Sequence, residues 1–268
     1  YLLLLDSASA RLSEDDSFDD LLFEIYEEVV TADTSHSRGD TLSVANRLAK
    51  RLLKEGFAPE EVTVIEYGGK GNLVARLRSH TPESEPILLL AHMDVVEADP
   101  VDWSVNPFEL TDAENYYYGR GTLDDKDEVA IHITNLIRIK REEVPLKRDV
   151  IVAITADEEG GPHNGARHLV EKHRELVETA FVINEGGGGI IKDGVYVANT
   201  VQTAEKVYQS YYLEVTNPGG HSSLPRKDNA IYQLSEALNK IEAYAFPVML
   251  NETTRAYFEG RLSIADEV

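Results

Sequence analysis

The feature that most constrains this chain is residues 149–161, an apolar stretch that ends abruptly in acidic residues and glycines. Its sequence is DVIVAITADEEGG, and it contains no charged residue from 150 to 156. Such an uninterrupted, β-branched run is typical of a strand that is buried on both faces of a sheet. Ligands of open α/β sheets bind beyond the carboxyl ends of such strands, so we expect Asp157, Glu158 and Glu159 to lie at a functional site.

Two other apolar runs end in the same way. Residues 87–91 (ILLLA) lead into His92 and Asp94, and residues 180–183 (AFVI) lead into Glu185 and a run of glycines. The three predicted strands would bring one histidine and several carboxylates to one edge of a sheet. The chain contains no cysteine. Histidine and carboxylates without thiolates are typical of a catalytic rather than a structural site for zinc or a similar divalent ion.

The remaining periodicity predicts an α/β fold. Helices and strands are expected in alternation, which favours βαβ units and a three-layer α/β/α domain with a mainly parallel sheet. The predicted helices are residues 18–30, 41–55, 126–141 and 165–177, and the predicted strands are residues 62–67, 72–78, 87–91, 150–156 and 180–183.

The pattern changes near residue 204. Residues 206–216 (KVYQSYYLEVT) alternate like a strand with one exposed face, and residues 228–244 have the apolar spacing of an amphipathic helix. This combination predicts a second, smaller domain with two layers, one of strands and one of helices. We therefore divide the chain into an N-terminal segment (1–17), a catalytic domain (18–203) and a second domain (204–268).

The charge of the chain limits its partners. Asp and Glu number 48 against 26 Lys and Arg, which gives a net charge of −22 and argues against binding to nucleic acid or to an anionic membrane. No segment is long and apolar enough to predict a membrane span. The first ten residues, YLLLLDSASA, resemble the end of a secretory signal peptide and favour a periplasmic or secreted protein, with a cytoplasmic protein as the alternative.

Five motifs follow one another along the chain: AHMDVV (91–96), GRGTLDDK (119–126), TADEEGG (155–161), INEGG (183–187) and NPGGHSSLP (217–225). Together they resemble the motifs of the M20 family of dizinc metallopeptidases. The family includes carboxypeptidases, dipeptidases, aminoacylases and deacylases of N-acyl amino acids. The resemblance implies a metal-dependent amide hydrolase whose catalytic domain carries an inserted two-layer α+β lid.

The resemblance also implies a site with two Zn²⁺ ions, for which Co²⁺ or Mn²⁺ are alternatives. Its metal ligands would be His92, Asp124, Glu159 and Glu185. Asp124 would bridge the two ions. Asp94 would orient the imidazole of His92, in agreement with strand geometry, because residues two apart on a strand share a face and ligating histidines usually contact a second carboxylate. Asp125, the residue after the bridging carboxylate, would not be a ligand.

Two further residues receive catalytic roles from the resemblance. Glu158 would be the general base, and His221 would stabilise the oxyanion from the lid, often across a dimer interface in the family. Glu158 and Glu159 should point in opposite directions, because adjacent side chains at a strand end do so. Asn229 is predicted to cap a helix, with substrate contact as the alternative. The remaining histidines, His36, His80, His132, His163, His168 and His173, are predicted to be non-catalytic.

One departure from the family pattern remains. A complete dizinc site in the family needs a further histidine from the end of the catalytic domain, and the chain has no histidine after His221. We therefore expect the sequence to end within the lid, and the alternative is a catalytically incomplete fragment. A carboxypeptidase or dipeptidase that acts on small peptides is the first interpretation. A deacylase of N-acyl amino acids is the second. Members of the family often dimerise through the lid, so the resemblance leaves a homodimer and a monomer as alternatives.

Overall fold

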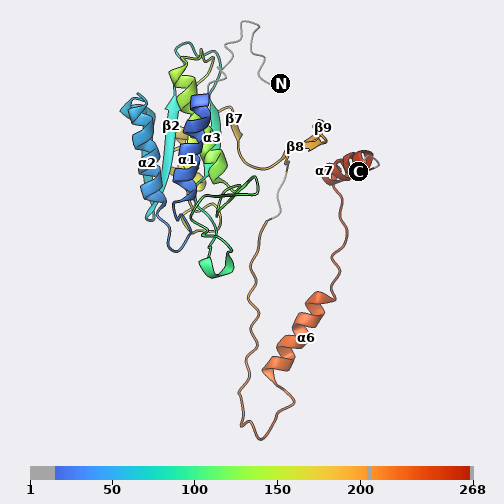
Figure 1. The fold of residues 1–268 in the computed structure, drawn as a ribbon. Helices are drawn as coiled ribbons and strands as arrows, with labels where there is room; N and C mark the ends of the chain where they lie inside the picture. Colours follow the sequence, from blue (N-terminus) through green and yellow to red (C-terminus); the bar gives the residue numbers. More distant parts are fainter. Residues whose placement is uncertain (1–15, 204–206, 266–268) are drawn as a thin grey trace. The chain divides into compact units, whose positions relative to one another are not determined.

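The computed structural model describes residues 16–203 and 207–265. The chain forms two units, Tyr1–Glu185 and Gly186–Val268, called the first and second units below (Figure 1). The predicted domain boundary lies later in the chain, at 203/204, and stays a prediction. The leucine run at residues 1–10, on which the expectation of export depends, lies outside the described residues.

A five-stranded sheet forms the centre of the first unit. The strand order is β1-β2-β6-β3-β7, with β2 antiparallel to both of its neighbours and β3 parallel to β6 and β7. Four of the five strands therefore run in one direction, which confirms the mainly parallel sheet. The strands are β1 (Val62–Tyr67), β2 (Lys70–Leu77), β3 (Ile87–His92), β6 (Val150–Thr155) and β7 (Phe181–Ile183).

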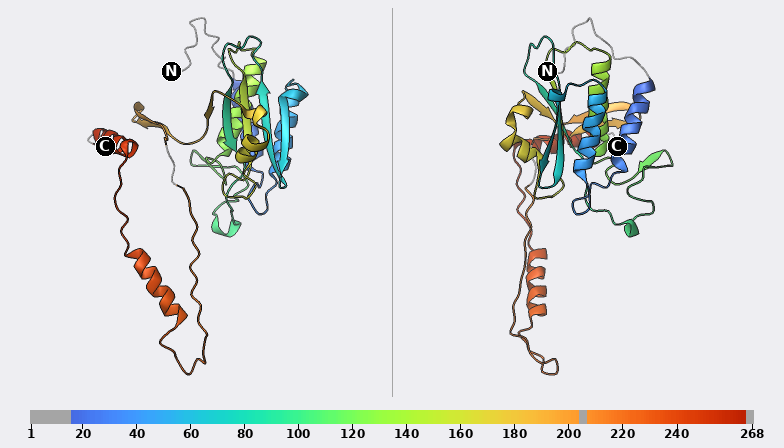
Figure 2. Two further views of the ribbon diagram at one scale, coloured as in Figure 1. Left: turned by 180° about the vertical axis from the view of Figure 1, so that it is seen from behind. Right: turned by 90° about the vertical axis from the view of Figure 1, so that its left-hand side faces the viewer.

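Helices cover both faces of this sheet, and Figure 2 shows the resulting layers. Strand β6 is buried along its whole length, as predicted. Its residues Val152 and Ile154 pack in a cluster with α1, α2 and α3, whereas Ile151 and Ala153 pack on the other face with Leu169 of α4. The predicted three layers are confirmed. The helices are α1 (Asp16–Val30), α2 (Thr41–Lys54), α3 (Lys126–Arg141), α4 (Gly165–Lys172) and α5 (Arg174–Val177).

The predicted helix at 165–177 is interrupted at His173, which separates α4 from α5. The connections carry short elements of their own, two of which pair as a hairpin between β3 and α3. These elements are η1 (Pro59–Glu61), η2 (Pro100–Asp102), β4 (Thr111–Ala113) and β5 (Tyr116–Tyr118). Because β6, β3 and β7 are parallel neighbours, their carboxyl ends lie at one edge of the sheet, as predicted from the three apolar runs.

The second unit contains the hairpin of β8 (Gly188–Lys192) and β9 (Val195–Thr200), followed by α6 (Ala230–Glu242) and α7 (Glu252–Ala265). Helix α6 confirms the helix predicted at 228–244. It begins after Asn229, whose Oδ1 accepts a hydrogen bond from the Ile231 N–H at 2.8 Å, so the capping interpretation of this asparagine is confirmed.

The strand predicted at 206–216 is wrong, because residues 207–216 form no regular secondary structure. Tyr208 and Tyr211 are 88% and 82% exposed. A half-exposed strand is stable only when it pairs with a neighbour, and no described segment pairs with this one. Helix α6 buries none of its residues, so the two-layer lid stays a prediction.

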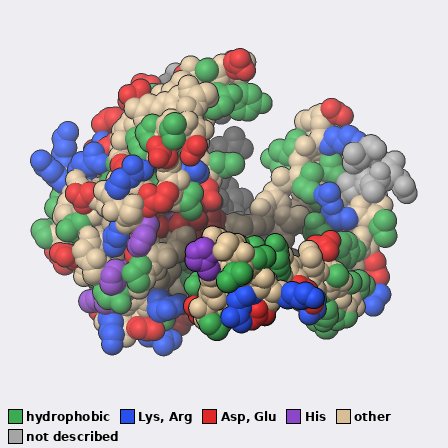
Figure 3. Space-filling model, turned by 90° about the horizontal axis from the view of Figure 1, so that it is seen from below, with side chains coloured by type: hydrophobic (Ala, Val, Ile, Leu, Met, Phe, Trp, Pro, Cys, Tyr) green, Lys and Arg blue, Asp and Glu red, His purple; other side chains and the backbone are tan. Residues whose placement is uncertain are grey.

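The surface is mixed in charge. Figure 3 shows acidic, basic and apolar side chains on the same face of the protein. Within residues 16–203 and 207–265, no helix combines the length and the hydropathy that a bilayer span requires.

Asn72 of β2 joins β1 and the turn after β6 at the end of the sheet that carries the acids. This side chain is fully buried, its Oδ1 accepts a hydrogen bond from Ala156 N at 3.0 Å, and its Nδ2 donates to Ile65 O at 3.3 Å. Asn72→Ala would leave both groups unpaired in the interior, so we expect the free energy of unfolding to fall by about 2–5 kcal/mol in urea denaturation.

Asn46→Ala is the matched control for this variant. Asn46 is exposed on α2 and bonds only within its own helix, to Leu42 O. Its loss should change the free energy of unfolding by no more than about 0.5 kcal/mol. Equal effects of the two substitutions would contradict the structural role of Asn72.

Candidate metal centre

His92 is the last residue of β3 and is only 3% exposed. Its main-chain N–H donates a hydrogen bond to Asp125 Oδ2 at 3.0 Å. Its Nδ1 lies 3.1 Å from the main-chain oxygen of Asp94 and 3.7 Å from the Asp94 carboxylate. A carbonyl oxygen can only accept, so Nδ1 carries a hydrogen, and Nε2 is left to face the carboxylates around it. The predicted contact of His92 with Asp94 is present, and the main-chain oxygen of Asp94 lies nearer to Nδ1 than its carboxylate does.

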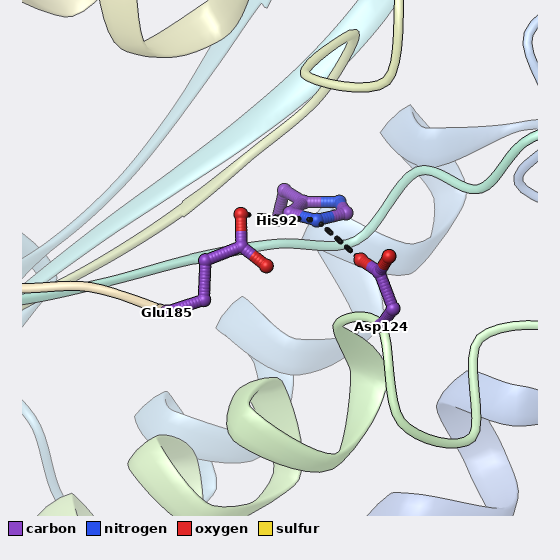
Figure 4. Close-up of side chains that lie close together, drawn as sticks. All are labelled: His92, Asp124 and Glu185. Carbon is purple, nitrogen blue, oxygen red and sulfur yellow. Dashed lines mark ion pairs between the residues drawn. The ribbon is translucent and has the colours of Figure 1, made fainter. Parts of the chain in front are cut away.

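Three carboxylates converge on His92 Nε2. Asp124 Oδ1 lies 3.0 Å from this nitrogen, Glu158 Oε2 lies 3.7 Å from it and Glu185 Oε1 lies 3.8 Å from it. Candidate ligand atoms of His92, Asp124 and Glu185 all lie within 4.8 Å of one another. Figure 4 shows these three side chains close together. Among the described residues no other such group of histidines and acids is present. The structure therefore brings together three of the four predicted ligands.

These three residues come from separate segments. His92 ends β3, Asp124 lies in the turn before α3, and Glu185 follows β7 by two residues. The Asp124–Asp125 peptide bond is cis. The parallel pairing of β3 with β7 places His92 and Glu185 at the same edge of the sheet.

Glu159 lies outside this group of three. Its main-chain N–H donates to Asp94 Oδ2 at 3.1 Å, and its carboxylate interacts electrostatically with Asp124. Burial, together with these negative charges, raises the pKa of Glu159. Glu158, the predicted general base, is the nearer of the two glutamates to His92 Nε2, and burial raises its pKa as well. The division of roles between the two glutamates stays a prediction.

The electrostatics of the site favour positive charge at His92 Nε2. Burial would lower the pKa of His92, but Asp94, Asp125 and Glu158 more than offset this and raise it to about 10. Burial would likewise raise the pKa of Asp94, yet the contact with His92 and the backbone N–H groups of the Glu158–Glu159 turn hold it below its usual value. A proton or a metal cation at Nε2 would interact favourably with the same carboxylates.

The donor set fits a divalent cation. Nε2 of His92 is buried and has no hydrogen-bond partner among the described residues, although carboxylate oxygens surround it. A buried polar atom without a partner commonly indicates a missing ion or water. One imidazole nitrogen and carboxylate oxygens are the ligands that zinc, cobalt and manganese accept in catalytic sites.

Asp125 has a structural role that the sequence did not predict. It is buried, and its carboxylate accepts the His92 N–H, so it fixes the backbone at the end of β3. Burial raises its pKa to about 7. Nothing in the local sequence signals this contact, because it joins two motifs that only the fold brings together.

His221 lies in the second unit. Its Nδ1 accepts a hydrogen bond from Ser223 N at 3.2 Å and lies 2.7 Å from Ser223 Oγ. Acceptance at Nδ1 leaves the ring hydrogen on Nε2, where it is available to donate. The predicted role of His221 in catalysis stays a prediction.

The chain is similar in sequence to members of one enzyme family. The sequence model described as "Peptidase family M20/M25/M40" matches residues 88–259. An N-fatty-acyl-amino acid synthase/hydrolase, PM20D1, of Xenopus tropicalis is 38% identical over 169 residues, which are 61% of this chain and 33% of that protein. An uncharacterized carboxypeptidase of Schizosaccharomyces pombe is 30% identical over 184 residues, which are 66% of this chain and 31% of that protein.

The fold is similar to that of solved structures as well. Human carnosine dipeptidase 1 matches with a TM-score of 0.53 and 22% identity over 63% of this chain and 39% of that chain. The chain spans about a third of the length of the two curated relatives. The family match covers well over half of the chain and includes all the residues of the candidate metal centre. This chain therefore belongs to peptidase family M20/M25/M40, a family of metal-dependent hydrolases.

Proposed function

We propose that this chain carries metal ligands and the general base of the active site of an amide hydrolase. The observation that supports this proposal is the convergence of Asp124, Glu158 and Glu185 on the buried Nε2 of His92. The reaction adds water across an amide bond and releases a carboxylic acid and an amine. We propose an N-acyl amino acid as the substrate, because the relative at 38% identity is an N-fatty-acyl-amino acid synthase/hydrolase.

In this proposal His92, Asp124 and Glu185 hold one divalent cation. Asp124 has a second carboxylate oxygen, and together with Glu159 it would contribute to a second cation. We propose zinc as the metal, with cobalt or manganese as alternatives, because all three accept nitrogen and oxygen ligands. Bound divalent cations polarise the amide carbonyl and lower the pKa of a water molecule.

Glu158 is the proposed general base. Its carboxylate lies beside His92 Nε2, and its side chain is 45% exposed, so it can contact both the metal centre and a bound substrate. Burial raises its pKa, which is the direction that suits a general base. Glu158 accepts a proton from the attacking water and delivers it to the amide nitrogen as the carbon–nitrogen bond breaks.

His221 is proposed to stabilise the negative charge that develops on the carbonyl oxygen. Its Nδ1 is held by Ser223, and Nε2 is left as a hydrogen-bond donor. A donor directed at the developing oxyanion lowers the barrier only in the transition state, which is the requirement for catalysis.

A peptidase is the second candidate function. The S. pombe relative at 30% identity carries the name of a carboxypeptidase, and the GHSSLP form of the 217–225 motif resembles the carboxypeptidase branch. Both functions would use the same metal and the same base. Their substrates differ in the chemical groups on either side of the amide bond.

Removal of the proposed nitrogen ligand tests the metal centre. His92→Ala should weaken zinc binding by more than about 100-fold in competition with a chromophoric chelator, because loss of an outer partner of a ligand alone costs about 10–100-fold. The control is His80→Ala, which removes an exposed histidine that lies outside every motif. Equal zinc affinity of the two variants would show that His92 is not a ligand.

Glu158→Gln tests the general base. The amide keeps the size of the side chain but cannot take a proton, so we expect kcat to fall by about 10²–10⁴-fold while the zinc content stays near that of the unmodified protein. Glu171→Gln, on the exposed side of α4, should leave kcat unchanged. Turnover that survives in Glu158→Gln would contradict the proposed role of Glu158.

A substrate panel separates the two candidate functions. The full-length protein should release amino acids faster from N-acyl amino acids than from dipeptides, as measured by detection of the free amine, and a chelator should stop both reactions. Faster hydrolysis of dipeptides would favour the peptidase. Hydrolysis that persists with a chelator would contradict metal dependence.

A further inference from the structure

A buried carboxylate lies directly before the catalytic glutamates. The Asp157 side chain has no exposed surface, its Oδ2 accepts a hydrogen bond from His163 N at 3.1 Å, and its Oδ1 lies 3.5 Å from His36 Nδ1 and 3.8 Å from Lys70 Nζ. Asp157, His36, Lys70 and His163 are called the Asp157 cluster below. A buried carboxylate is costly unless cations and N–H groups surround it, and the cluster supplies both.

The Asp157 cluster ties together distant parts of the first unit. His36 lies between α1 and α2, Lys70 begins β2, and His163 precedes α4. Lys70 Nζ also donates to the main-chain oxygen of His36 at 2.8 Å, and the His163 ring packs edge-on against Tyr67 at 5.0 Å. None of the side-chain partners of Asp157 is a candidate metal ligand.

The surroundings of the cluster are closely packed. A Cβ added to Gly68 would lie 2.3 Å from the His163 ring, and a Cβ added to Gly161 would lie 2.0 Å from the carboxylate of Asp157. Gly68 therefore allows the His163 ring to lie close to the main chain, and Gly161 allows the same for the Asp157 carboxylate. The Asp157 carboxylate thus fills space that a side chain at residue 161 would need.

The backbone of Asp157 is also unusual. Its φ is +56°, in the left-handed region that few residues other than glycine, asparagine and aspartate adopt. Asn164 Nδ2 donates to the main-chain oxygen of Asp157 at 3.3 Å, and Asn72 holds the preceding residue, Ala156. The left-handed residue turns the chain away from the direction of β6. The Glu158 carboxylate then lies beside His92 Nε2, and the Glu159 N–H reaches Asp94.

We propose that Asp157 is a positioning residue for Glu158 and Glu159. Its carboxylate fixes the turn after β6 through a hydrogen bond from His163 N–H on one oxygen and through the nearby Lys70 and His36 side chains on the other. This inference rests on the proposed function for the roles of the two glutamates. It assigns to Asp157 a purpose beyond stability, namely the placement of a base and of a ligand.

Two substitutions at Asp157 separate the contribution of its carboxylate from the contribution of its backbone conformation. Asp157→Asn keeps an acceptor for His163 N–H but removes the charge opposite Lys70, whereas Asp157→Gly keeps the left-handed φ and removes the side chain. At saturating zinc, kcat should fall by about 10-fold in Asp157→Asn and by about 100-fold in Asp157→Gly, with little change in KM, because a displaced Glu158 is poorly placed to accept the proton of the attacking water. The zinc dissociation constant should rise by about 10–100-fold in Asp157→Gly.

Asp149→Asn is the matched control. Asp149 precedes the same strand at its other end, is 9% exposed, and accepts hydrogen bonds from Arg76 Nε and Ser79 N, both at 2.8 Å. Its loss should lower the melting temperature as Asp157→Asn does, yet kcat and the zinc dissociation constant should stay within about two-fold, because the substitution is remote from the centre.

The outcomes are distinguishable. The positioning role is wrong if both Asp157 variants keep the kcat and the zinc affinity of Asp149→Asn. If Asp157→Gly does not fold, Asp157→Asn alone decides through the same two measurements. If the unmodified protein shows no metal-dependent hydrolysis, the proposed function fails, while the zinc dissociation constants still test whether Asp157 positions Glu159.

Discussion

The site depends on the parallel pairing of β6 with β3. Six residues of β6 are buried, the strand contacts helices on both faces, and its register places Thr155 opposite His92. Apolar burial of this extent is the main source of stability in a domain of this kind. The same pairing sets His92 beside the turn that carries Glu158 and Glu159, so the energy that forms the sheet also assembles the site.

A concentration of carboxylates at one edge requires cations nearby. On the metal side, positive charge is favoured at His92 Nε2. At the start of the turn after β6, Lys70 and His36 lie close to the Asp157 carboxylate. Another basic side chain, Lys126, is fully buried, donates to Ala32 O at 2.8 Å, and has its pKa lowered by burial to about 7. The acidic edge is thus supported by individual basic side chains within a chain of net charge −22.

Much of the fold and of the site could be predicted from local patterns. The apolar run before Asp157 predicted a central buried strand. The apolar runs that end at His92 and Glu185 predicted that these two side chains lie close together, because the carboxyl ends of parallel strands lie at the same edge of a sheet. The failed strand at 206–216 shows the limit of this reasoning. An alternating apolar and polar pattern is compatible with a strand. A strand also needs a neighbouring strand to pair with, and the pattern does not identify one.

The sequence by itself determined the periodicities of the α/β sheet, the order of its motifs and the identities of the acids and the histidine, because these depend on local spacing and on side-chain chemistry. Only the tertiary structure decided which atoms meet. The fold places Glu158 rather than Glu159 beside His92 Nε2. It also brings the Asp125 carboxylate within hydrogen-bond distance of the His92 N–H. The Asp157 carboxylate is enclosed by Lys70, His36 and His163. Such contacts join segments far apart in the chain, and their distances depend on packing that no single segment encodes.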